Sequence, residues 1–401
     1  MASQTHSSLG HVIVTGGCGF LGHHVVRLLL RFHPQTRISV LDLRTTNNRV
    51  QSPNVSYHDG DITDADGLRE LFGKLRPDVV IHTASPTAFL PKDILYKVNV
   101  NGTKKLLEAS QEAGVKAFVY TSSASVIMDK ELMLINADER WPVITGNDSP
   151  EYYSETKVCT YESPYHLVIL PILLHTNPYQ ALAETAVLKA NRTSAYPNFL
   201  TCAIRPAGIF GEGDVQFLPN VLYAARTGKY KFQLGDNENL FDCTYVENVA
   251  WAHLLGSLAL LETHKRLPST MLDHEKVDGE AFFITNDSPV YFWDFSRFAS
   301  HAAGYEMPRE NQIWKISVGT AMFIGGLLEN VMWLLGKKPS LTRSQARFSC
   351  VTRYMNINKA KQRLGYAPIV EFEEGVRRAA KHTRERMEVE WAREKETAKA
   401  K

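Results

Sequence analysis

The stretch Val12–Gly22 most constrains what this chain can fold into, because an apolar run leads directly into closely spaced glycines. Gly16, Gly19 and Gly22 follow one another at intervals of three. Glycine reaches backbone angles that other residues avoid, and its missing Cβ lets a pyrophosphate approach the turn. A helix that begins near Phe20 would point its free N–H groups at those phosphates. The stretch therefore predicts a strand, a turn and a helix that together bind a dinucleotide.

A second apolar strand, Ile38–Leu41, ends in Asp42, twenty residues after Gly22. A carboxylate at this point can accept hydrogen bonds from the adenosine ribose and repels a 2′-phosphate, so NAD is favoured over NADP. The nearby Arg44 weakens that preference, and a solvated carboxylate at a strand end is the alternative interpretation.

A third strand is expected to end at Gly60, and the residues after it face the same edge of the sheet. Asp61 could bond the adenine amino group there, and Ile62 could cover the ring. Phe20 and Leu21, in the first turn of the helix, are also predicted to contact the cofactor.

The segment Tyr153–Lys157 predicts proton transfer beside the cofactor, because residues four apart share one face of a helix. A free tyrosine has a pKa of about 10, and a neighbouring ammonium lowers it toward neutrality. A serine that orients the substrate oxygen is expected after the strand Ala117–Thr121. Ser123 is the favoured candidate, with Ser122 and Ser125 as alternatives. Without these surroundings, a Tyr and a Lys four apart would be an ordinary surface pair.

Several segments together resemble the extended short-chain dehydrogenase/reductase superfamily, and within it the 3β-hydroxysteroid dehydrogenase branch. The closest resemblance is to the fungal decarboxylating sterol-4α-carboxylate 3-dehydrogenases of ergosterol synthesis. The segments that carry it are Thr121–Val126, Tyr153–Lys157 and Asp242–Val249, with Pro77–Ser85, Val98–Thr103 and Arg205–Gly211 in support.

The resemblance implies NAD-dependent oxidation of the 3β-hydroxyl of a 4α-carboxysterol, followed by loss of CO₂. Tyr153 would be the base, Lys157 would lower its pKa and hold the nicotinamide ribose, and Ser123 would orient the oxygen. It also implies that Thr83, Ala84, Ser85 and Asn99 lie beside the cofactor. A homodimer, contact with other sterol C4-demethylation enzymes, and a place on the cytoplasmic face of the endoplasmic reticulum or on lipid droplets are further expectations.

Three other functions remain open at this point. The chain could be a 3β-oxidoreductase of a terpenoid pathway, or a nucleotide-sugar epimerase or reductase on the same core. It could also be an NAD-binding regulator whose catalytic site has been disabled.

The third possibility arises because residues 158–180 interrupt the expected helix. Joining Lys157 directly to Ala181 gives an uninterrupted amphipathic helix, whereas the intervening twenty-three residues contain Pro164, Pro171 and Pro178. The codons that Val158-Cys159 and Gln180 permit match fungal splice signals, and those of Thr176–Pro178 permit a branch point. An unspliced intron in the gene sequence is the preferred hypothesis, and a genuine loop of this lineage is the alternative.

The amino-acid composition argues against some classes of function. The 401 residues carry 45 basic and 43 acidic side chains, a balance that argues against a nucleic-acid binding surface. Five scattered cysteines suit a reducing compartment and show no metal-ligand spacing.

Alternating strands and helices from Val12 to Arg205 predict an α/β Rossmann-type doubly wound parallel sheet. We expect an NAD-binding domain over 1–205, a smaller C-terminal substrate lobe over 206–385 that returns to the core near Phe282–Asn286, and a charged tail over 386–401.

The stretch Ile316–Leu335 is almost wholly apolar, but it includes Glu329. Its length could just span a bilayer, yet a carboxylate inside the membrane is costly. A buried helix of the lobe is one interpretation. The preferred one is a helix that lies on the membrane surface beside the sterol entrance, with basic residues toward anionic headgroups.

Overall fold

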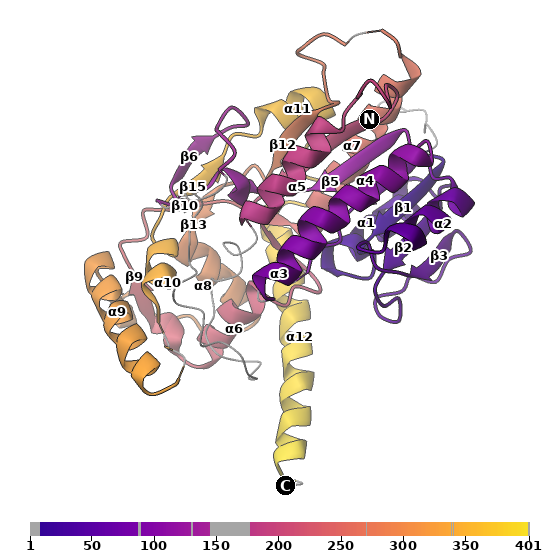
Figure 1. Ribbon diagram of the computed structural model, residues 1–401. Helices are drawn as coiled ribbons and strands as arrows, with labels where there is room; N and C mark the ends of the chain where they lie inside the picture. Colours follow the sequence, from indigo (N-terminus) through magenta and orange to yellow (C-terminus); the bar gives the residue numbers. More distant parts are fainter. Residues whose placement is uncertain are drawn as a thin grey trace.

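The computed structural model describes residues 9–86, 90–129, 131–144, 177–269, 271–337, 339 and 341–399. Figure 1 shows a central sheet with helices on both sides and a second group of short strands and helices beside it.

The central sheet has seven parallel strands in the order β12-β7-β5-β4-β1-β2-β3. The order reverses between β1 and β4, and ligands of open parallel sheets bind outside the carboxyl ends of the strands at such a point. The strands are β1 (His11–Thr15), β2 (Arg37–Asp42), β3 (Val55–Asp59), β4 (Val79–His82), β5 (Ala117–Thr121), β7 (Leu200–Pro206) and β12 (Glu280–Ile284).

Both faces of this sheet are covered, as alternating strand side chains show. Val12 and Val14 belong to the hydrophobic cluster under α1 (Phe20–Phe32) and α7 (Val246–Lys265), whereas Ile13 belongs to the cluster on the opposite face. That opposite face is covered by α2 (Ala65–Leu75), α4 (Thr103–Glu112) and α5 (Asn177–Lys189). Because neighbouring residues of a strand point to opposite faces, burial on both sides explains why these strands are apolar throughout.

The second lobe is built around a four-stranded sheet in the order β13-β10-β15-β6 and the strand pair β14-β9. Aromatic side chains fill much of its core, with Phe217 stacked on Phe295 and both Phe295 and Phe372 against Phe210. Its strands are β6 (Leu134–Ala137), β9 (Phe232–Leu234), β10 (Leu240–Phe241), β13 (Val290–Tyr291), β14 (Trp314–Ile316) and β15 (Arg353–Met355). Its helices are α6 (Leu218–Arg226), α8 (Phe292–Ala302), α9 (Val318–Leu334) and α10 (Arg343–Phe348), followed by α11 (Asn358–Leu364) and α12 (Phe372–Lys399).

Shorter elements join these parts. They are α3 (Lys92–Leu95), a π-helix (Tyr96–Gly102), a 3₁₀ turn (Ala124–Ile127) and the parallel pair β8 (Gly208–Phe210) and β11 (Cys243–Tyr245), with two further 3₁₀ turns (Lys229–Lys231 and Glu310–Gln312).

The two parts of the fold exchange segments. β6, from the N-terminal half, pairs with β15 in the second sheet, while β12 and α7 return from beyond Pro206 to the central sheet. The return near Phe282 is thus present, but the chain first leaves the central sheet for the second lobe at β6, before residue 205.

Most of the predicted elements in the described residues are found where the sequence placed them. α1 begins at Phe20, and β5 covers Ala117–Thr121. Two boundaries differ: β3 ends at Asp59 and not at Gly60, and α5 begins at Asn177, four residues before the predicted restart at Ala181. Pro178 sits in the first turn of α5, where a missing backbone N–H leaves no helical hydrogen bond unmade.

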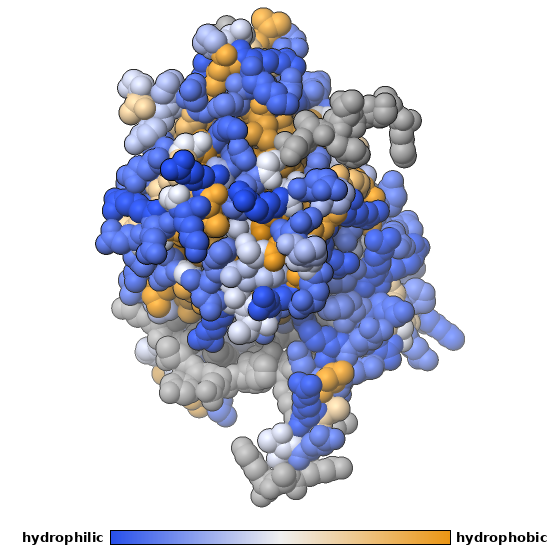
Figure 2. All heavy atoms as spheres, turned by 90° about the vertical axis from the view of Figure 1, so that its right-hand side faces the viewer, coloured by the Kyte–Doolittle hydropathy of each residue, from blue (hydrophilic) through white to orange (hydrophobic). Residues whose placement is uncertain are grey.

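The surface is uneven in polarity. Figure 2 shows that the face on the right of Figure 1, the side of α2 and β3, is mainly hydrophilic with apolar residues in small groups. α9 lies at the opposite edge of the molecule in Figure 1. The last turns of α12 extend away from the rest of the molecule toward the C-terminus.

Candidate active site

The glycine turn connects β1 to α1 as predicted. Gly16 has a φ of 70°, and its N–H donates to the Leu41 carbonyl at 2.8 Å. A Cβ on Gly22 would lie 2.2 Å from the Gly16 oxygen, so the helix can pack on the turn only because Gly22 has no side chain. No side chain caps the N-terminus of α1, whose first residue is Phe20. The turn therefore offers backbone N–H groups to an anion at the carboxyl edge of the sheet.

Asp42 lies at the end of β2, next to this turn. Its Oδ2 accepts a hydrogen bond from the Cys18 N–H at 3.0 Å. The neighbouring strand ends in Asp59, which instead accepts two hydrogen bonds from Thr45, both at 2.8 Å. Asp42 is thus the carboxylate of the two that contacts the glycine turn, where its predicted role in ribose recognition requires it. The ribose contact itself stays a prediction.

The residues predicted beside the nicotinamide converge from two elements. Thr83 donates to the Thr15 carbonyl at 2.8 Å, and a Cβ on Gly16 would lie 2.7 Å from the Cα of Ala84. Ser85 donates to Oδ1 of Asn99 at 3.2 Å. Asn99 lies in the π-helix, an irregularity that is frequent at functional sites. The loop after β4 and this helix therefore meet directly beside the glycine turn.

The residues predicted near the adenine are less informative. Asp61 is exposed and accepts a hydrogen bond from the Thr63 N–H at 2.8 Å. Ile62 is buried and packs against Gly102 of the π-helix. Leu21 is also buried, within α1. Their adenine contacts stay predictions.

The geometry separates the three candidate serines that follow β5. Ser122 and Ser125 are each only 2% exposed, whereas Ser123 is partly exposed. The Oγ atoms of Ser123 and Ser125 lie 2.7 Å apart, and the Ser125 N–H also donates to the Ser123 Oγ. Ser123 is therefore the most exposed of the three serines, and Ser125 lies within hydrogen-bond distance of its hydroxyl. Both residues line the pocket described next, so the choice of Ser123 as the catalytic serine stays a prediction.

Ser123 lines a small pocket between the carboxyl edge of the central sheet and the second sheet. The described residues that line it are Ser123, Ala124, Ser125, Met128, Leu134, Pro206, Ala207, Gly208, Phe241, Asp242, Arg353 and Met355. Two of them, Asp242 and Arg353, carry ionisable groups, and no individual role was predicted for either residue. No local pattern could have singled out Arg353, because β15 reaches this pocket only through its long-range pairing with β10 and β6.

Asp242 has an unusual environment for a carboxyl group. It is 3% exposed, its Oδ2 accepts a hydrogen bond from the Met355 N–H at 2.8 Å, and its Oδ1 has no partner among the described residues. Burial raises the pKa of Asp242 to about 7, and the negative charge of Asp287 adds to the shift. Near neutral pH a substantial fraction of Asp242 is therefore a neutral acid.

The two residues predicted to transfer the proton, Tyr153 and Lys157, lie outside the described residues. The predicted continuation of their helix is α5, and a buried ion pair fixes α5 in place. The Arg205 Nη2 lies 2.5 Å from the Glu184 Oε1, and the two side chains are 4% and 1% exposed. A second hydrogen bond joins the Arg205 Nε to the other oxygen of Glu184 at 2.9 Å. This two-point contact holds α5 against β7 in a defined rotation.

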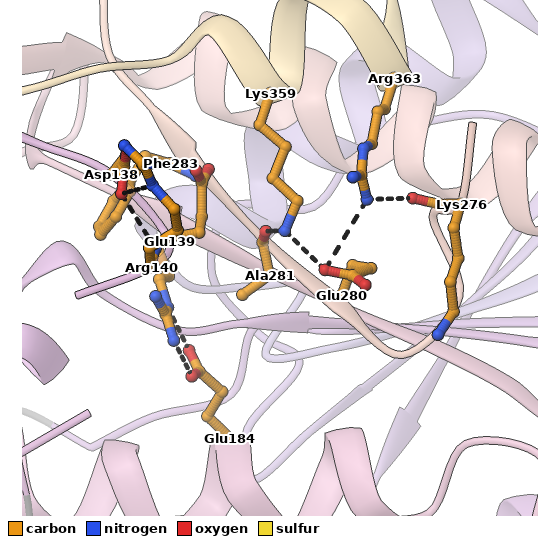
Figure 3. Close-up of polar contacts among 11 residues, drawn as sticks. Asp138, Glu139, Arg140, Glu184, Lys276, Glu280, Ala281, Phe283, Lys359 and Arg363 are labelled. Carbon is orange, nitrogen blue, oxygen red and sulfur yellow. Dashed lines mark hydrogen bonds and ion pairs between the residues drawn. The ribbon is translucent and has the colours of Figure 1, made fainter. Parts of the chain in front are cut away.

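Figure 3 shows Glu184 together with a separate set of polar contacts around β12. Glu139, after β6, accepts a hydrogen bond from the Phe283 N–H of β12 at 2.7 Å. Lys359 of α11 donates to Glu280 and to the Ala281 carbonyl at 2.7 and 2.9 Å. These contacts connect β12 both to the segment after β6 and to α11.

Comparison with known proteins identifies a family that the sequence matches. Residues 13–162 and 173–315 match the 3-beta hydroxysteroid dehydrogenase/isomerase family. The unmatched residues 163–172 fall inside the segment 158–180 that the sequence analysis singled out.

Among individual proteins, the chain is 37% identical over 376 residues to the sterol-4-alpha-carboxylate 3-dehydrogenase, decarboxylating, of Saccharomyces cerevisiae, covering 92% of this chain and 97% of that protein. It is 34% identical to the enzyme of the same name from Mus musculus, over 91% and 88% of the two chains.

Solved structures agree on the fold. A UDP-glucose 4-epimerase of Thermotoga maritima has a TM-score of 0.60 at 19% identity, over 94% of this chain and 99% of that one. A dTDP-glucose 4,6-dehydratase of Bacillus anthracis, solved in complex with NAD, has a TM-score of 0.61 at 17% identity, over 94% and 97%. Since the family match covers well over half of the sequence, this chain belongs to the 3-beta hydroxysteroid dehydrogenase/isomerase family.

Proposed function

We propose that this protein is an NAD-dependent dehydrogenase that oxidises the 3β-hydroxyl of a 4α-carboxysterol, after which the product loses CO₂. The observation that carries the proposal is identity of 37–38% to three fungal enzymes with this activity in their names, over 94–97% of the lengths of those enzymes. Relatives that share the name occur in mammals as well.

The described residues fit an NAD molecule. The glycine turn has no side chain where the pyrophosphate would lie, and Asp42 contacts that turn where it can accept hydrogen bonds from the ribose. Thr83–Ser85 and Asn99 form the adjoining wall. NAD, when bound, supplies the acceptor for the hydride that leaves carbon 3 of the sterol.

The chain's own groups would handle the proton and the oxygen. Tyr153 would take the proton of the 3β-hydroxyl, with Lys157 lowering the pKa of the phenol. Ser123 would donate a hydrogen bond to the same oxygen. Oxidation places a ketone one carbon from the carboxylate, so the C–CO₂ bond can break with its electrons moving onto the ketone oxygen. Ser123 and the protonated Tyr153 would then stabilise the enolate, and no separate decarboxylase residue is needed.

The test is a coupled measurement on the purified protein with NAD and a 4α-carboxysterol. We expect NADH absorbance and released CO₂ to rise together. Tyr153→Phe should keep NAD binding but lose turnover by about 10²–10⁴-fold, the usual contribution of a general base. Turnover confined to nucleotide sugars would contradict the proposal, and near-normal turnover by Tyr153→Phe would show that another residue takes the proton.

We further propose that the second lobe rests on a membrane surface through α9. One side of α9 is occupied by α10: Ala321 and Gly325 are buried, and Glu329 accepts hydrogen bonds from the Arg343 N–H and Nε at 2.6 and 2.8 Å. The carboxylate that would be costly in lipid is thus neutralised on the protein side. The other side exposes Phe323 at 74% and Leu327 at 55%.

The exposed apolar surface includes the end of α9 and the neighbouring strand pair β9–β14. Trp333 and Leu334 at its end are 67% and 75% exposed, and Trp314 and Phe232, which lie opposite each other in β14 and β9, are 70% and 48% exposed. The exposed cations in the described part of this region include Lys231, Lys315 and Lys337. Large apolar side chains with flanking lysines are typical of a helix that lies in the interface of an anionic bilayer.

Among the described residues, no helix is both long and apolar enough to cross a bilayer. The proposed contact is therefore with the surface, and a location on the cytoplasmic face of the endoplasmic reticulum or on lipid droplets remains part of the proposal. The homodimer and the contact with other C4-demethylation enzymes stay predictions.

A further inference from the structure

A buried histidine connects the strand before the glycine turn to the helix that carries Asn99. His82 is the last residue of β4, it pairs with Thr15 of β1 in the sheet, and it is 1% exposed. Its Nδ1 lies 2.7 Å from the Thr15 Oγ1, and its Nε2 lies 3.0 Å from the Oγ1 of Thr103, the first residue of α4. His82 is thus a fully hydrogen-bonded side chain that the proposed transfer of proton and hydride does not use.

The direction of each hydrogen bond in this chain follows from its last acceptor. The Thr103 hydroxyl lies 2.7 Å from the Asn99 carbonyl, which can only accept, so Thr103 donates to it. The Thr103 oxygen then accepts from His82, whose Nε2 therefore carries the hydrogen. Burial lowers the pKa of His82 to about 3, so the ring is neutral and its Nδ1 accepts from the Thr15 hydroxyl. A single tautomer of His82 connects Thr15 to the backbone of Asn99.

The side chain of Asn99 keeps one donor for a bound molecule. Asn99 is 3% exposed and lies in the π-helix. Its Oδ1 accepts a hydrogen bond from Ser85, and its Nδ2 has no hydrogen-bond partner among the described residues. A buried amide N–H without a partner is costly, so a ligand that accepts from it would be favoured.

The order of the central sheet indicates which part of NAD would meet Asn99. Asp42 ends β2, the glycine turn follows β1, and Ser85, which contacts Asn99, follows β4. These strands are neighbours in the order β4-β1-β2. A dinucleotide with its adenosine at Asp42 and its pyrophosphate at the turn therefore extends its nicotinamide half past the end of β4.

We propose that His82 is a positioning residue for the cofactor: through Thr103 it holds Asn99 at a fixed place relative to the glycine turn, so that the Asn99 amide can donate to the nicotinamide half of NAD. The inference rests on the NAD-binding part of the proposed function and is independent of the sterol. Histidine suits this task because its two nitrogens can accept and donate on different sides of one rigid ring. His82 would act on NAD only through Asn99.

The experiment compares NAD with ADP, which has the same adenosine and pyrophosphate but lacks the nicotinamide half. Isothermal titration calorimetry on the full-length protein gives Kd for both ligands. Thr103→Val keeps the shape of the side chain but removes the hydroxyl that joins His82 to Asn99. We expect this variant to bind NAD about 3–10-fold more weakly, as when one hydrogen bond is lost, and to bind ADP as wild type does.

Two variants test His82 itself, and a third serves as the control. His82→Leu removes both hydrogen bonds and should weaken NAD binding by a similar factor, whereas His82→Gln keeps one acceptor and one donor and should restore most of the affinity. The control is His11→Leu. His11 is 3% exposed and has both ring nitrogens hydrogen-bonded, to Ser39 and Leu75, but it lies at the opposite end of β1. This variant should lose thermal stability without a change in the ratio of the two Kd values.

Equal weakening of NAD and ADP binding in Thr103→Val and His82→Leu would show that His82 has only a structural role. Unchanged NAD affinity in both folded variants would overturn the inference directly. If His82→Leu does not fold, Thr103→Val decides, because it breaks the same connection without a change of shape. Sterol turnover tests the proposed function separately. A wild-type protein that binds NAD but does not oxidise a 4α-carboxysterol would reject that function, whereas the ratio of the NAD and ADP affinities would still decide the role of His82.

Discussion

Asp42 and Asp242 are both carboxyl groups at strand ends, yet their surroundings give them different chemistry. Asp42 is partly exposed and accepts a backbone hydrogen bond, whereas Asp242 is buried and one of its oxygens has no partner in the described part of the chain. Burial favours the neutral form of a carboxyl group and raises the pKa of Asp242 to about 7. Asp42 can accept hydrogen bonds from ribose hydroxyls, whereas Asp242 can also donate a hydrogen bond when it is protonated.

Cofactor preference should depend on Asp42. We expect wild type to prefer NAD, and Asp42→Ala or Asp42→Ser to narrow the gap to NADP, because the repulsion of a 2′-phosphate is removed. The measurement is kcat/KM with each cofactor. Asp59→Ala, at the matching end of β3, is the control and should keep the wild-type ratio. A wild-type protein that prefers NADP would disprove this interpretation of Asp42.

Asp242 should make stability depend on pH. Its folded pKa of about 7 lies above the ordinary value near 3.8, so the folded state binds more protons than the unfolded chain between these values. This contribution to stability is complete below the unfolded pKa and is lost as pH rises toward 7. We expect the free energy of unfolding of wild type to fall relative to Asp242→Asn across that window, in urea denaturation at several pH values. A constant difference between the two proteins would contradict the burial argument.

The Glu184–Arg205 pair should contribute strongly to the stability of the folded state. Glu184→Gln leaves the Arg205 charge buried without its partner, a change that typically costs about 3–5 kcal/mol. Glu373→Gln breaks the exposed pair with Arg377 and should cost less than about 1 kcal/mol. Urea denaturation measures both. Similar losses in the two variants would mean that solvent reaches the Glu184 pair.

At the scale of elements, the sequence predicted what local patterns encode. β5 was predicted to the residue because a buried parallel strand is apolar along its whole length, and α1 because glycines mark its start. The sequence did not predict that Ser123 and Arg353 line one pocket, because this requires β15 to pair with β10, more than a hundred residues earlier in the chain. The Glu184–Arg205 pair was missed for a similar reason, since burial of a charged side chain is visible only once α5 and β7 are packed.

The segment 158–180 should impair the protein if it is translated intron. In a variant that lacks it, Lys157 would directly precede Ala181, and Glu184 would follow Lys157 by four positions. Tyr153, Lys157 and Glu184 would then share one helix face, and Arg205 already anchors that face to the sheet. We expect higher soluble yield and higher turnover than in the 401-residue chain.

A second deletion provides the control. Removing only residues 158–176 leaves Pro178 inside the joined helix. We therefore expect a smaller increase in soluble yield and turnover for this variant than for the first one. Equal stability and turnover in the full chain and the first variant would make the segment a genuine loop, as would transcripts without a junction between the codons of Lys157 and Ala181.

At the scale of the whole molecule, different parts of the surface differ in polarity. The face at α2 and β3 is mainly hydrophilic, while α9 and the β9–β14 pair expose large apolar side chains. The pocket lined by Ser123 lies between the central sheet and the lobe that carries α9. A sterol taken from a membrane would thus meet the protein on the lobe that also forms one wall of its pocket.

Membrane association should depend on the exposed face of α9. Replacing Phe323, Leu327 and Trp333 by polar residues should release the folded protein from anionic liposomes in a sedimentation assay. Replacing the similarly exposed Leu43, Leu272 and Val389, which lie elsewhere on the surface, should leave sedimentation unchanged. Undiminished sedimentation of the α9 variant would show that another surface makes the contact.

The position of β12 at the edge of the central sheet has a consequence for synthesis on the ribosome. β7 leaves the ribosome first, and its partner follows only after residues 207–279 have been translated. Until then β7 is an open edge strand that can pair with a nascent neighbour on the same messenger RNA. The vulnerable interval ends only when β12 is added, so a chaperone that shields hydrophobic strands should matter most for this protein between the emergence of β7 and that of β12.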